Sequence, residues 1–439
     1  MIATAGFFNN AAAQDSTAVT TKNNTFTVDA SILVRGEVRH GALDDNEQNA
    51  YNEEEKLGPQ TARFIQERTR LSFGYSRPHL ELKVTGQHSG VWGQSDGGSL
   101  SVFEAWVKLT ANNGLFAQIG RQTISYDDER VLGANDFTMA GYSHDVLKVG
   151  FENDRHKIHA IVGFNQNDEN TNGGTYYADG GRPYKTMQTL WYHFDPTTTF
   201  GASFLFMNLG VQNTTMIDAE KENKTEYQQM VGTYLKWQPQ RLTAEFSYYY
   251  QMGINPEGLK LRAWMTSIET RYRLDRWELG AGYYYMSGDK WFAVPPGGDI
   301  GLAQHTVMRG FSPVYGSHHK FYGAMDFFYL KTFVASSSPG LQDAHVNAVF
   351  KPIDKLSLMT AYHFMAITAN LESVGKPLGH EIELGASFQI LKDVNLTAGY
   401  SFMHGTENMV KLKRTSHQRN LHWAWLSISF TPRIFSAKF

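Results

Sequence analysis

Apolar and polar residues alternate with a period of two along residues 381–402, and this alternation predicts two β-strands. In the first arm, Ile382 and Leu384 alternate with Glu381 and Glu383, and the second arm repeats the pattern. A period of two gives each strand one apolar face and one polar face. The break between the arms has three residues, which is short enough only for an antiparallel hairpin turn.

The same alternation recurs from residue 25 to the C-terminal region. Its repetition predicts an all-β chain of about 18 strands. The predicted strands are residues 25–39, 62–76, 79–92, 101–110, 114–124, 143–152, 156–165, 185–194, 199–209, 226–237, 241–252, 259–273, 276–287, 341–350, 354–366, 379–390, 394–404 and 420–431.

The connections between these strands alternate between short and long. Short turns centre on dipeptides such as Arg77-Pro78 and Lys392-Asp393, whereas the long connections are rich in Gly, Asn and Asp. Sorting short turns to one rim and long loops to the other is typical of a transmembrane antiparallel up-and-down β-barrel of the bacterial outer membrane. A soluble sandwich has no reason to sort its loops in this way. An even strand number places both termini at the short-turn, periplasmic rim.

Composition agrees with this class and removes several others. Charged residues make up 19% of the 439-residue chain and aromatic residues 13%, and no run of about 18 apolar residues predicts a transmembrane helix. Strands that cross a membrane carry a much weaker hydropathy signal, so a membrane location stays open. The chain has no cysteine, which excludes disulfides and thiolate chemistry. A net charge of -3 without a basic stripe argues against a nucleic-acid partner.

The N-terminal residues are expected to lie outside the barrel. Residues 1–13 end in three alanines before Gln14 and resemble the end of a secretory signal, with residues 14–24 as a tail and residues 25–439 as the barrel. A basic n-region and a full apolar core are missing, so a disordered tail is the alternative.

Two neighbouring motifs resemble those of a known family. The segment Phe103–Lys108 (FEAWVK) is followed by Ile119–Gln122 (IGRQ), and this pair is similar to the Glu-x-Trp-Val and Gly-Arg-Gln strands of the alginate-export outer-membrane barrels. Residues Tyr126–Gly133 and 311–326 resemble the version common in Bacteroidetes relatives. The resemblance implies an 18-stranded barrel and passage of an anionic polysaccharide through an arginine-rich pore.

Charged residues on the polar strand faces, together with two candidates near the loop at residues 125–142, are expected to line the lumen. Arg121 belongs to this set only if a bulge after Gly120 changes the side to which the following residue points. The predicted pore-lining residues are Arg35, Glu37, Arg39, Arg68, Arg70, Lys83, Glu104, Lys108, Arg121, Arg130, Glu245, Glu269, Arg271, Glu381 and Glu383.

The arginines of this set have two interpretations. As a functional set, six of them form a basic track for anionic solutes, because the planar guanidinium binds carboxylates in a bidentate manner. These six are Arg35, Arg68, Arg70, Arg121, Arg130 and Arg271. Alternatively, they pair with carboxylates such as Glu37, Glu104, Glu245 and Glu269 and brace the barrel wall. The polar face carries both signs of charge, so a purely basic channel is not predicted.

The long loops suggest a gate and a weak metal signal. The connection at residues 288–340 is long enough to fold inward or cover the mouth, and Gly297-Gly298-Asp299 and His318-His319 are candidates for gating the pore. Asp127, Asp128, Glu129, Asp136 and Asp145 form an acidic stretch that could offer oxygen ligands to calcium. The stretch lacks EF-hand spacing and solvated acidic loops are common, so no metal or other cofactor is assigned.

The sequence therefore predicts an outer-membrane pore of a Gram-negative bacterium. The pore would allow passive passage of anionic or polar solutes, including an exported polysaccharide, with membrane lipid and other outer-membrane proteins as partners. The alternative is a non-conducting barrel that serves as a scaffold subunit. An enzyme is not predicted, because the chain has no Gly-x-Ser-x-Gly, His-Glu-x-x-His or Walker motif.

Overall fold

The fold was obtained as a computed structural model. It describes residues 24–41, 61–166, 169, 171, 184–213, 224–290, 306–328, 338–371, 374–413 and 419–439. The expected signal remnant (residues 1–13), almost all of the expected tail and the Gly297-Gly298-Asp299 motif lie outside the described residues.

Over the described residues, 18 strands form the wall of the barrel. They are β1 (Thr25–His40), β2 (Thr61–Arg77), β3 (Leu80–Val91), β4 (Ser99–Thr110), β5 (Leu115–Gln122), β6 (His144–Glu152), β7 (His156–Phe164), β8 (Thr186–Thr197), β9 (Phe200–Gln212), β10 (Thr225–Trp237), β11 (Leu242–Ile254), β12 (Lys260–Leu274), β13 (Trp277–Met286), β15 (Leu341–Ile353), β16 (Leu356–Ala366), β17 (Pro377–Leu391), β18 (Val394–Gly405) and β19 (Asn420–Phe430).

Short elements supplement the wall. They are β14 (Val307–Met308), β20 (Arg433–Lys438), a 3₁₀ turn at His318–Lys320 and the helix α2 (Glu407–Lys413). Within the described part of the chain, no helix combines the length and the apolar character that crossing a membrane requires.

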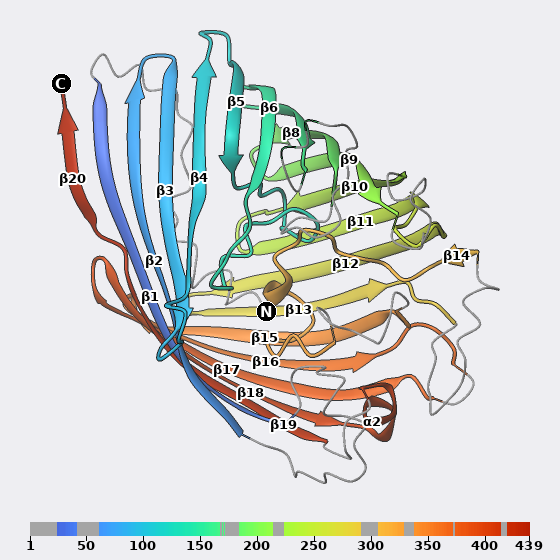
Figure 1. The fold of residues 1–439 in the computed structure, drawn as a ribbon. Helices are drawn as coiled ribbons and strands as arrows, with labels where there is room; N and C mark the ends of the chain where they lie inside the picture. Colours follow the sequence, from blue (N-terminus) through green and yellow to red (C-terminus); the bar gives the residue numbers. More distant parts are fainter. Residues whose placement is uncertain are drawn as a thin grey trace.

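The wall closes on itself through its first and last strands. Each wall strand pairs antiparallel with its neighbours, and β1 pairs with both β2 and β19, from Ile32 opposite Phe430 to His40 opposite His422 (Figure 1). Closure pairs the free edge of β1 with that of β19, which matters because an unsatisfied backbone group in lipid costs several kcal/mol. The prediction of a closed antiparallel barrel with about 18 strands is confirmed.

The C-terminal strand continues past the predicted boundary. After Thr431 and Pro432 the chain resumes as β20, which pairs with the start of β1. Pro432 interrupts the alternation and lacks an N–H group, so the sequence pattern placed the end of the strand at residue 431. The backbone groups of Asn24 and Phe439 exchange hydrogen bonds of 2.8 and 2.9 Å, which brings the first described residue and the last residue together.

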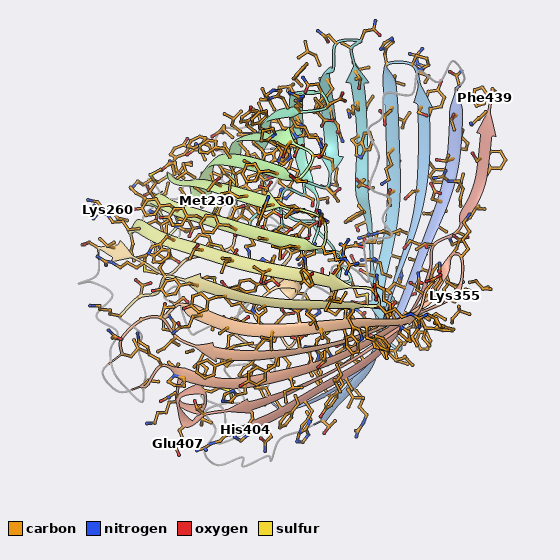
Figure 2. All side chains as sticks on the ribbon, turned by 180° about the vertical axis from the view of Figure 1, so that it is seen from behind. Met230, Lys260, Lys355, His404, Glu407 and Phe439 are labelled. Carbon is orange, nitrogen blue, oxygen red and sulfur yellow. The ribbon has the colours of Figure 1, made fainter. Side chains whose placement is uncertain are left out.

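The two faces of the wall differ in polarity as the alternation predicts. Ile382 and Leu384 on β17 are 45% and 52% exposed on the outside, whereas Glu381 and Glu383 are fully buried inside. Apolar outside and polar inside is the arrangement that a lipid environment requires. Figure 2 shows side chains on both faces of the wall, with Lys355 at the rim of short turns and His404 and Glu407 at the other rim.

Candidate functional site

Residues 123–143, which connect β5 to β6, fold into the barrel; we call them the first inserted segment. At one end Tyr126 stacks on Trp191 of β8 with 4.4 Å between ring centroids. Further along, Asp136 binds Arg68 of β2, and Phe137 packs edge-on against Trp423 of β19. Because β8 and β19 belong to different sectors of the wall, the segment crosses the lumen.

Residues 306–328 form a second inserted segment that is bound to the first. The Gly133 N–H donates to the Tyr315 carbonyl, and the Ser317 N–H donates to the Glu129 carbonyl, both at 2.9 Å. Coil of both segments is visible inside the wall in Figure 1. The buried His319 stacks on Phe137 with 3.4 Å between ring centroids, so the His318-His319 pair lies where the two segments meet. The two segments therefore form one inner body within the barrel.

Backbone strain is concentrated in this inner body. Nine non-glycine residues have a positive φ among the described residues, and six of them lie in the inserted segments. They include Val314 at φ 41°, and a β-branched residue rarely adopts this conformation. Strained residues persist only where the surrounding contacts determine them, and they are common at functional sites.

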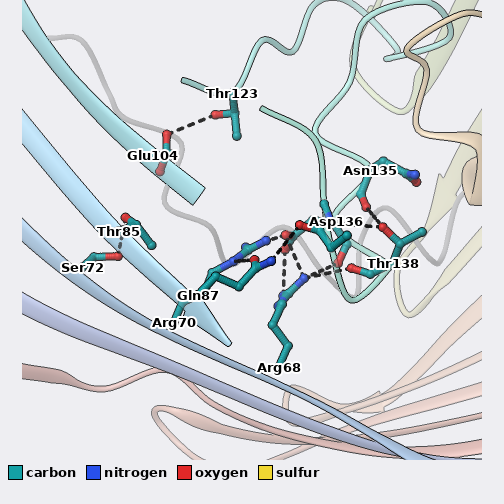
Figure 3. A network of polar contacts seen from close by, with 12 residues as sticks. Arg68, Arg70, Ser72, Thr85, Gln87, Glu104, Thr123, Asn135, Asp136 and Thr138 are labelled. Carbon is teal, nitrogen blue, oxygen red and sulfur yellow. Dashed lines mark hydrogen bonds and ion pairs between the residues drawn. The ribbon is translucent and has the colours of Figure 1, made fainter. Parts of the chain in front are cut away.

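A group of arginines on β1 and β2 faces the first inserted segment, and we call it the basic cluster. It consists of Arg35, Arg39, Arg68 and Arg70 with the carboxylates of Glu37 and Asp136. Arg35 and Arg39 both bind Glu37 at 2.8 Å. Arg68 and Arg70 converge on Asp136 at 3.1 and 2.6 Å (Figure 3). Four guanidinium groups thus surround two carboxylates, which leaves a surplus of positive charge on this part of the inner wall.

Asp136 is the most exposed member of the pairs that it forms with Arg68 and Arg70. Its side chain keeps 38% of its surface exposed, while those of Arg68 and Arg70 keep 5% and 12%. Burial opposes ionisation of Asp136, but the attraction of Arg68 and Arg70 outweighs it and holds the pKa below its ordinary value. The Asp136 carboxylate is therefore ionised at neutral pH and occupies the arginine pair.

A second charged group lies on the inner faces of β12, β15, β16 and β17, and we call it the acidic–histidine cluster. Its members are fully or almost fully buried. They are Glu269, Asp343, His345, His363, Glu381 and Glu383. The second inserted segment covers this cluster, because the N–H groups of Ala324 and Met325 donate to Glu383 and Glu381 at 2.7 and 3.0 Å.

The remaining predicted pore-lining residues also have partners. Lys83 binds Glu104 at 2.6 Å and Arg271 binds Glu245 at 2.7 Å. Lys108 lies 4.6 Å from the centroid of the Phe116 ring.

Arg130, in the first inserted segment, binds Asp128 at 2.7 Å. Its guanidinium lies 4.0 Å from the ring centroids of both Tyr284 and Phe321. Each of the six arginines proposed as a basic track thus contacts a carboxylate, and the role of the whole set in lining a pore stays a prediction.

Arg121 lies on the outer face of the wall, in contrast to the expectation. Alternation along β5 places it on the same side as Ile119, which is 55% exposed. It binds Asp145 of β6 at 2.7 Å, and this pair is opposed in register. Gly120 adopts φ 122°, but the pairing of β4 with β5 continues through it without a shift, so the expected change of side does not occur.

The acidic residues considered for calcium do not share one partner. Asp127 accepts from the Trp191 indole, Asp128 binds Arg130, and Glu129 binds Lys320. Asp136 and Asp145 bind arginines on different faces of the wall. Burial raises the pKa of Asp127 to about 7, with the nearby Asp128 adding to the effect against a hydrogen bond from Ser203.

The sequence reasoning missed Asp343, His345 and His363. A signal was present, because Asp343 and His345 are two apart on the polar face of one strand, and His363 lies on the polar face of the next. The register of β15 with β16 then places His345 directly opposite His363. That register depends on pairing across the turn, which alternation within a single strand does not define.

Residues 73–369, more than half of the chain, match the sequence family described as alginate export. The chain belongs to the alginate-export family. No curated protein matches the sequence.

Solved outer-membrane porins share the fold of this alginate-export family member. OccK9 (OpdG) of Pseudomonas aeruginosa has a TM-score of 0.59 at 12% identity, covering 93% of this chain and 98% of its own. OprD of the same organism has a TM-score of 0.59 at 11% identity, with coverage of 93% and 96%. OccAB1 of Acinetobacter baumannii has a TM-score of 0.58 at 13% identity, with coverage of 93% and 97%. This member of the family is an outer-membrane channel for solutes in a Gram-negative bacterium.

Proposed function

We propose that this channel passes anionic solutes, including an anionic polysaccharide, by passive diffusion along the basic cluster. The observation that carries the proposal is the convergence of Arg68 and Arg70 on one partly exposed carboxylate in the lumen. Guanidinium groups bind carboxylates in a planar, charge-assisted geometry. A carboxylate held in this way by the protein marks a position that fits the carboxylate of a solute.

Asp136 would act as an internal competitor for this position. A passing carboxylate exchanges with the Asp136 carboxylate at Arg68 and Arg70, so that neither the arginines nor the solute loses its partner completely. Conduction requires binding that is favourable enough for entry and weak enough for release. The exchange satisfies both requirements, because the solute gains only the difference between two similar ion pairs.

Ion selectivity in planar lipid bilayers tests the proposal. The purified channel is expected to prefer anions, as measured by the reversal potential in a salt gradient. The double variant Arg68→Ala, Arg70→Ala is expected to lose most of that preference. Arg121→Ala is the matched control, because it removes a paired arginine from the outer face and leaves the lumen unchanged. Cation selectivity that the double variant leaves unchanged would contradict the proposal.

Passage of an anionic polysaccharide is tested by a separate measurement. Anionic and neutral oligosaccharides of equal length are added to single open channels, and the anionic ones are expected to cause longer and more frequent blockades. Equal blockade by both would limit the proposal to small anions. An absence of channel conductance in a correctly folded protein would favour the scaffold alternative instead.

A further inference from the structure

The acidic–histidine cluster contains an arrangement that neither ion passage nor wall bracing accounts for. Asp343 lies between two histidines: His363 Nδ1 is 2.9 Å and His345 Nδ1 is 3.4 Å from its Oδ2 atom. One ligand atom from each residue can be chosen so that all three lie within 4.8 Å of one another. All three side chains are completely buried.

Each histidine also has a carboxylate at its far nitrogen. His345 Nε2 is 2.9 Å from Glu269, and His363 Nε2 is 3.3 Å from Glu383. In metal sites, a coordinating histidine almost always donates its other N–H to a carboxylate, carbonyl or water, which fixes the orientation of the ring. His345 has this pattern through its hydrogen bond to Glu269, whereas His363 Nε2 faces Glu383 without a hydrogen bond. Both Nδ1 atoms are turned towards the shared Asp343.

The backbone of the wall is adapted to this arrangement. Glu269 and His345 belong to β12 and β15, which are separated by β13, and Gly282 of β13 is the register partner of both. A Cβ atom on Gly282 would collide with the Glu269 carboxylate and with the His345 ring. The absence of a side chain at Gly282 lets Glu269 reach His345 across the intervening strand.

The hydrogen bonds of the cluster are incomplete. Among the described residues, His345 Nδ1, Glu269 Oε1 and Glu383 Oε2 are buried atoms that have no hydrogen-bond partner. Buried polar atoms are normally satisfied, and each exception calls for a cause such as an unseen ion. The carboxylates of Asp343, Glu269 and Glu383 meet in this buried site, and a divalent cation bound to neutral imidazoles would offset two of their negative charges.

We propose that Asp343, His345 and His363 bind a divalent transition-metal ion of the Zn²⁺ type, with Glu269 and Glu383 orienting the two histidines. Two imidazole nitrogens and one carboxylate oxygen suit zinc, iron(II) or cobalt(II) better than calcium or magnesium, which prefer oxygen ligands. The ion would fasten β15 to β16. Through Glu383, which accepts the Ala324 N–H, it would also hold the second inserted segment against the wall. The proposal does not depend on the solute that the channel passes.

Metal retention by the full chain tests the site. The protein carries no polyhistidine tag and is folded from urea into detergent micelles with Co²⁺ or Zn²⁺, because the buried site must fill while the wall forms. After removal of free metal, one ion per chain is expected, and Co²⁺ should give visible absorption bands of low-coordinate cobalt. Parallel samples folded with Ca²⁺ or Mg²⁺ should retain none. A wild-type chain that retains no Co²⁺ or Zn²⁺ overturns the proposal.

Variants locate the ion. Asp343→Asn and His363→Gln are expected to abolish retention, and Glu269→Gln to weaken affinity about 10- to 100-fold, as expected for a residue that orients a ligand. His159→Gln is the matched control, because His159 is also buried beside a carboxylate, Glu152 at 2.7 Å, but lies on β7. Retention that Asp343→Asn and His363→Gln leave unchanged overturns the assignment.

A measurement on the wild-type chain tests the site even if the variants fail to fold. The site is loaded with Cu²⁺, and pulsed electron paramagnetic resonance counts the coordinating imidazoles. Two imidazoles are expected. A spectrum without imidazole coupling would mean that the buried histidines share protons with the carboxylates and bind no metal.

Discussion

Asp136 is the residue whose removal should change the basic cluster most. Asp136→Asn leaves Arg68 and Arg70 without their carboxylate, so the lumen gains one positive charge. The preference for anions over cations is expected to increase about two- to fivefold at low salt, where screening between charges is weak. The measurement is the reversal potential of single channels.

Asp145→Asn is the control for this change. This change also removes one carboxylate charge, here from the ion pair between Arg121 and Asp145, but that ion pair lies on the outer face. Its ion selectivity should equal that of the parent protein. An Asp136→Asn channel that is less anion-selective than its parent would contradict the account of the basic cluster.

Asp127 should make the selectivity depend on pH. Because burial raises its pKa to about 7, the carboxyl group is largely neutral at pH 6 and largely ionised at pH 8. The lumen therefore gains negative charge as pH rises, and anion preference is expected to fall between pH 6 and pH 8. In Asp127→Asn this fall should be much smaller. Reversal potentials at the two pH values provide the test, and an unchanged fall in the variant would assign the dependence to another group.

At the scale of elements, the sequence predicted the strands well. It also indicated that the connection containing the second inserted segment could fold inward, but it gave no sign of the first inserted segment. Each strand shows its alternation locally, because one face meets lipid and the other does not. The first inserted segment has no such period, since its residues contact wall strands that are far apart in the chain. Arg121 shows a different limit. Alternation alone places it on the outer face, as in the structure, whereas the expected bulge after Gly120, which would have turned Arg121 into the lumen, does not form.

Strand β5 requires a glycine at position 120. At φ 122° an alanine would be strained, and its Cβ atom would collide with the Ala105 carbonyl oxygen and come within 2.9 Å of Trp106 Cα. Gly120→Ala is expected to lower the free energy of unfolding by about 2 kcal/mol, within the range for strained backbone. Urea unfolding in detergent micelles measures this.

Gly86→Ala is the matched control in the nearby strand β3. A Cβ atom on Gly86 meets nothing within 4 Å, and its φ is not positive. Its effect on stability should stay within about 0.5 to 1 kcal/mol and favour the folded state, because alanine has less conformational freedom in the unfolded chain. Equal losses in both variants would contradict the strain argument.

At the scale of the whole molecule, the barrel consists of a wall whose strands pair with one another and an inner body, the two inserted segments, that narrows the lumen. Replacing residues 127–138 with a short Gly-Ser linker should leave the wall closed, because wall strands pair with each other and not with this segment. Single-channel conductance is expected to increase severalfold, and anion preference should rise as Asp136 is lost.

Shortening the exposed connection between β3 and β4 (residues 92–98) is the control for the deletion. This connection is also on the long-loop rim but is largely exposed, so conductance should stay close to that of the parent. A deletion of residues 127–138 that leaves conductance unchanged would mean that the inner body does not limit flow.

The charge layout could be predicted only in part from the sequence. Alternation identified which acidic and basic residues point inward, such as Arg68 and Glu383, and it indicated a mixed wall. It did not show that the basic cluster forms on β1 and β2 while the acidic–histidine cluster forms on β12, β15, β16 and β17. That separation depends on the closed register of all 18 strands and on the inserted segments, which supply Asp136 to one side and backbone donors to the other.

The pairing of β1 with β19 and β20 has a consequence for biogenesis. Val34 lies opposite Ile428, so the first strand cannot find its final partner until nearly the whole chain has been synthesised and delivered. Contacts of such large sequence separation form slowly, because a long loop must close before they can form. Until then both end strands expose hydrogen-bonding edges that invite aggregation. The end strands therefore have to be kept from pairing with other chains until β19 is in place to close the sheet against β1.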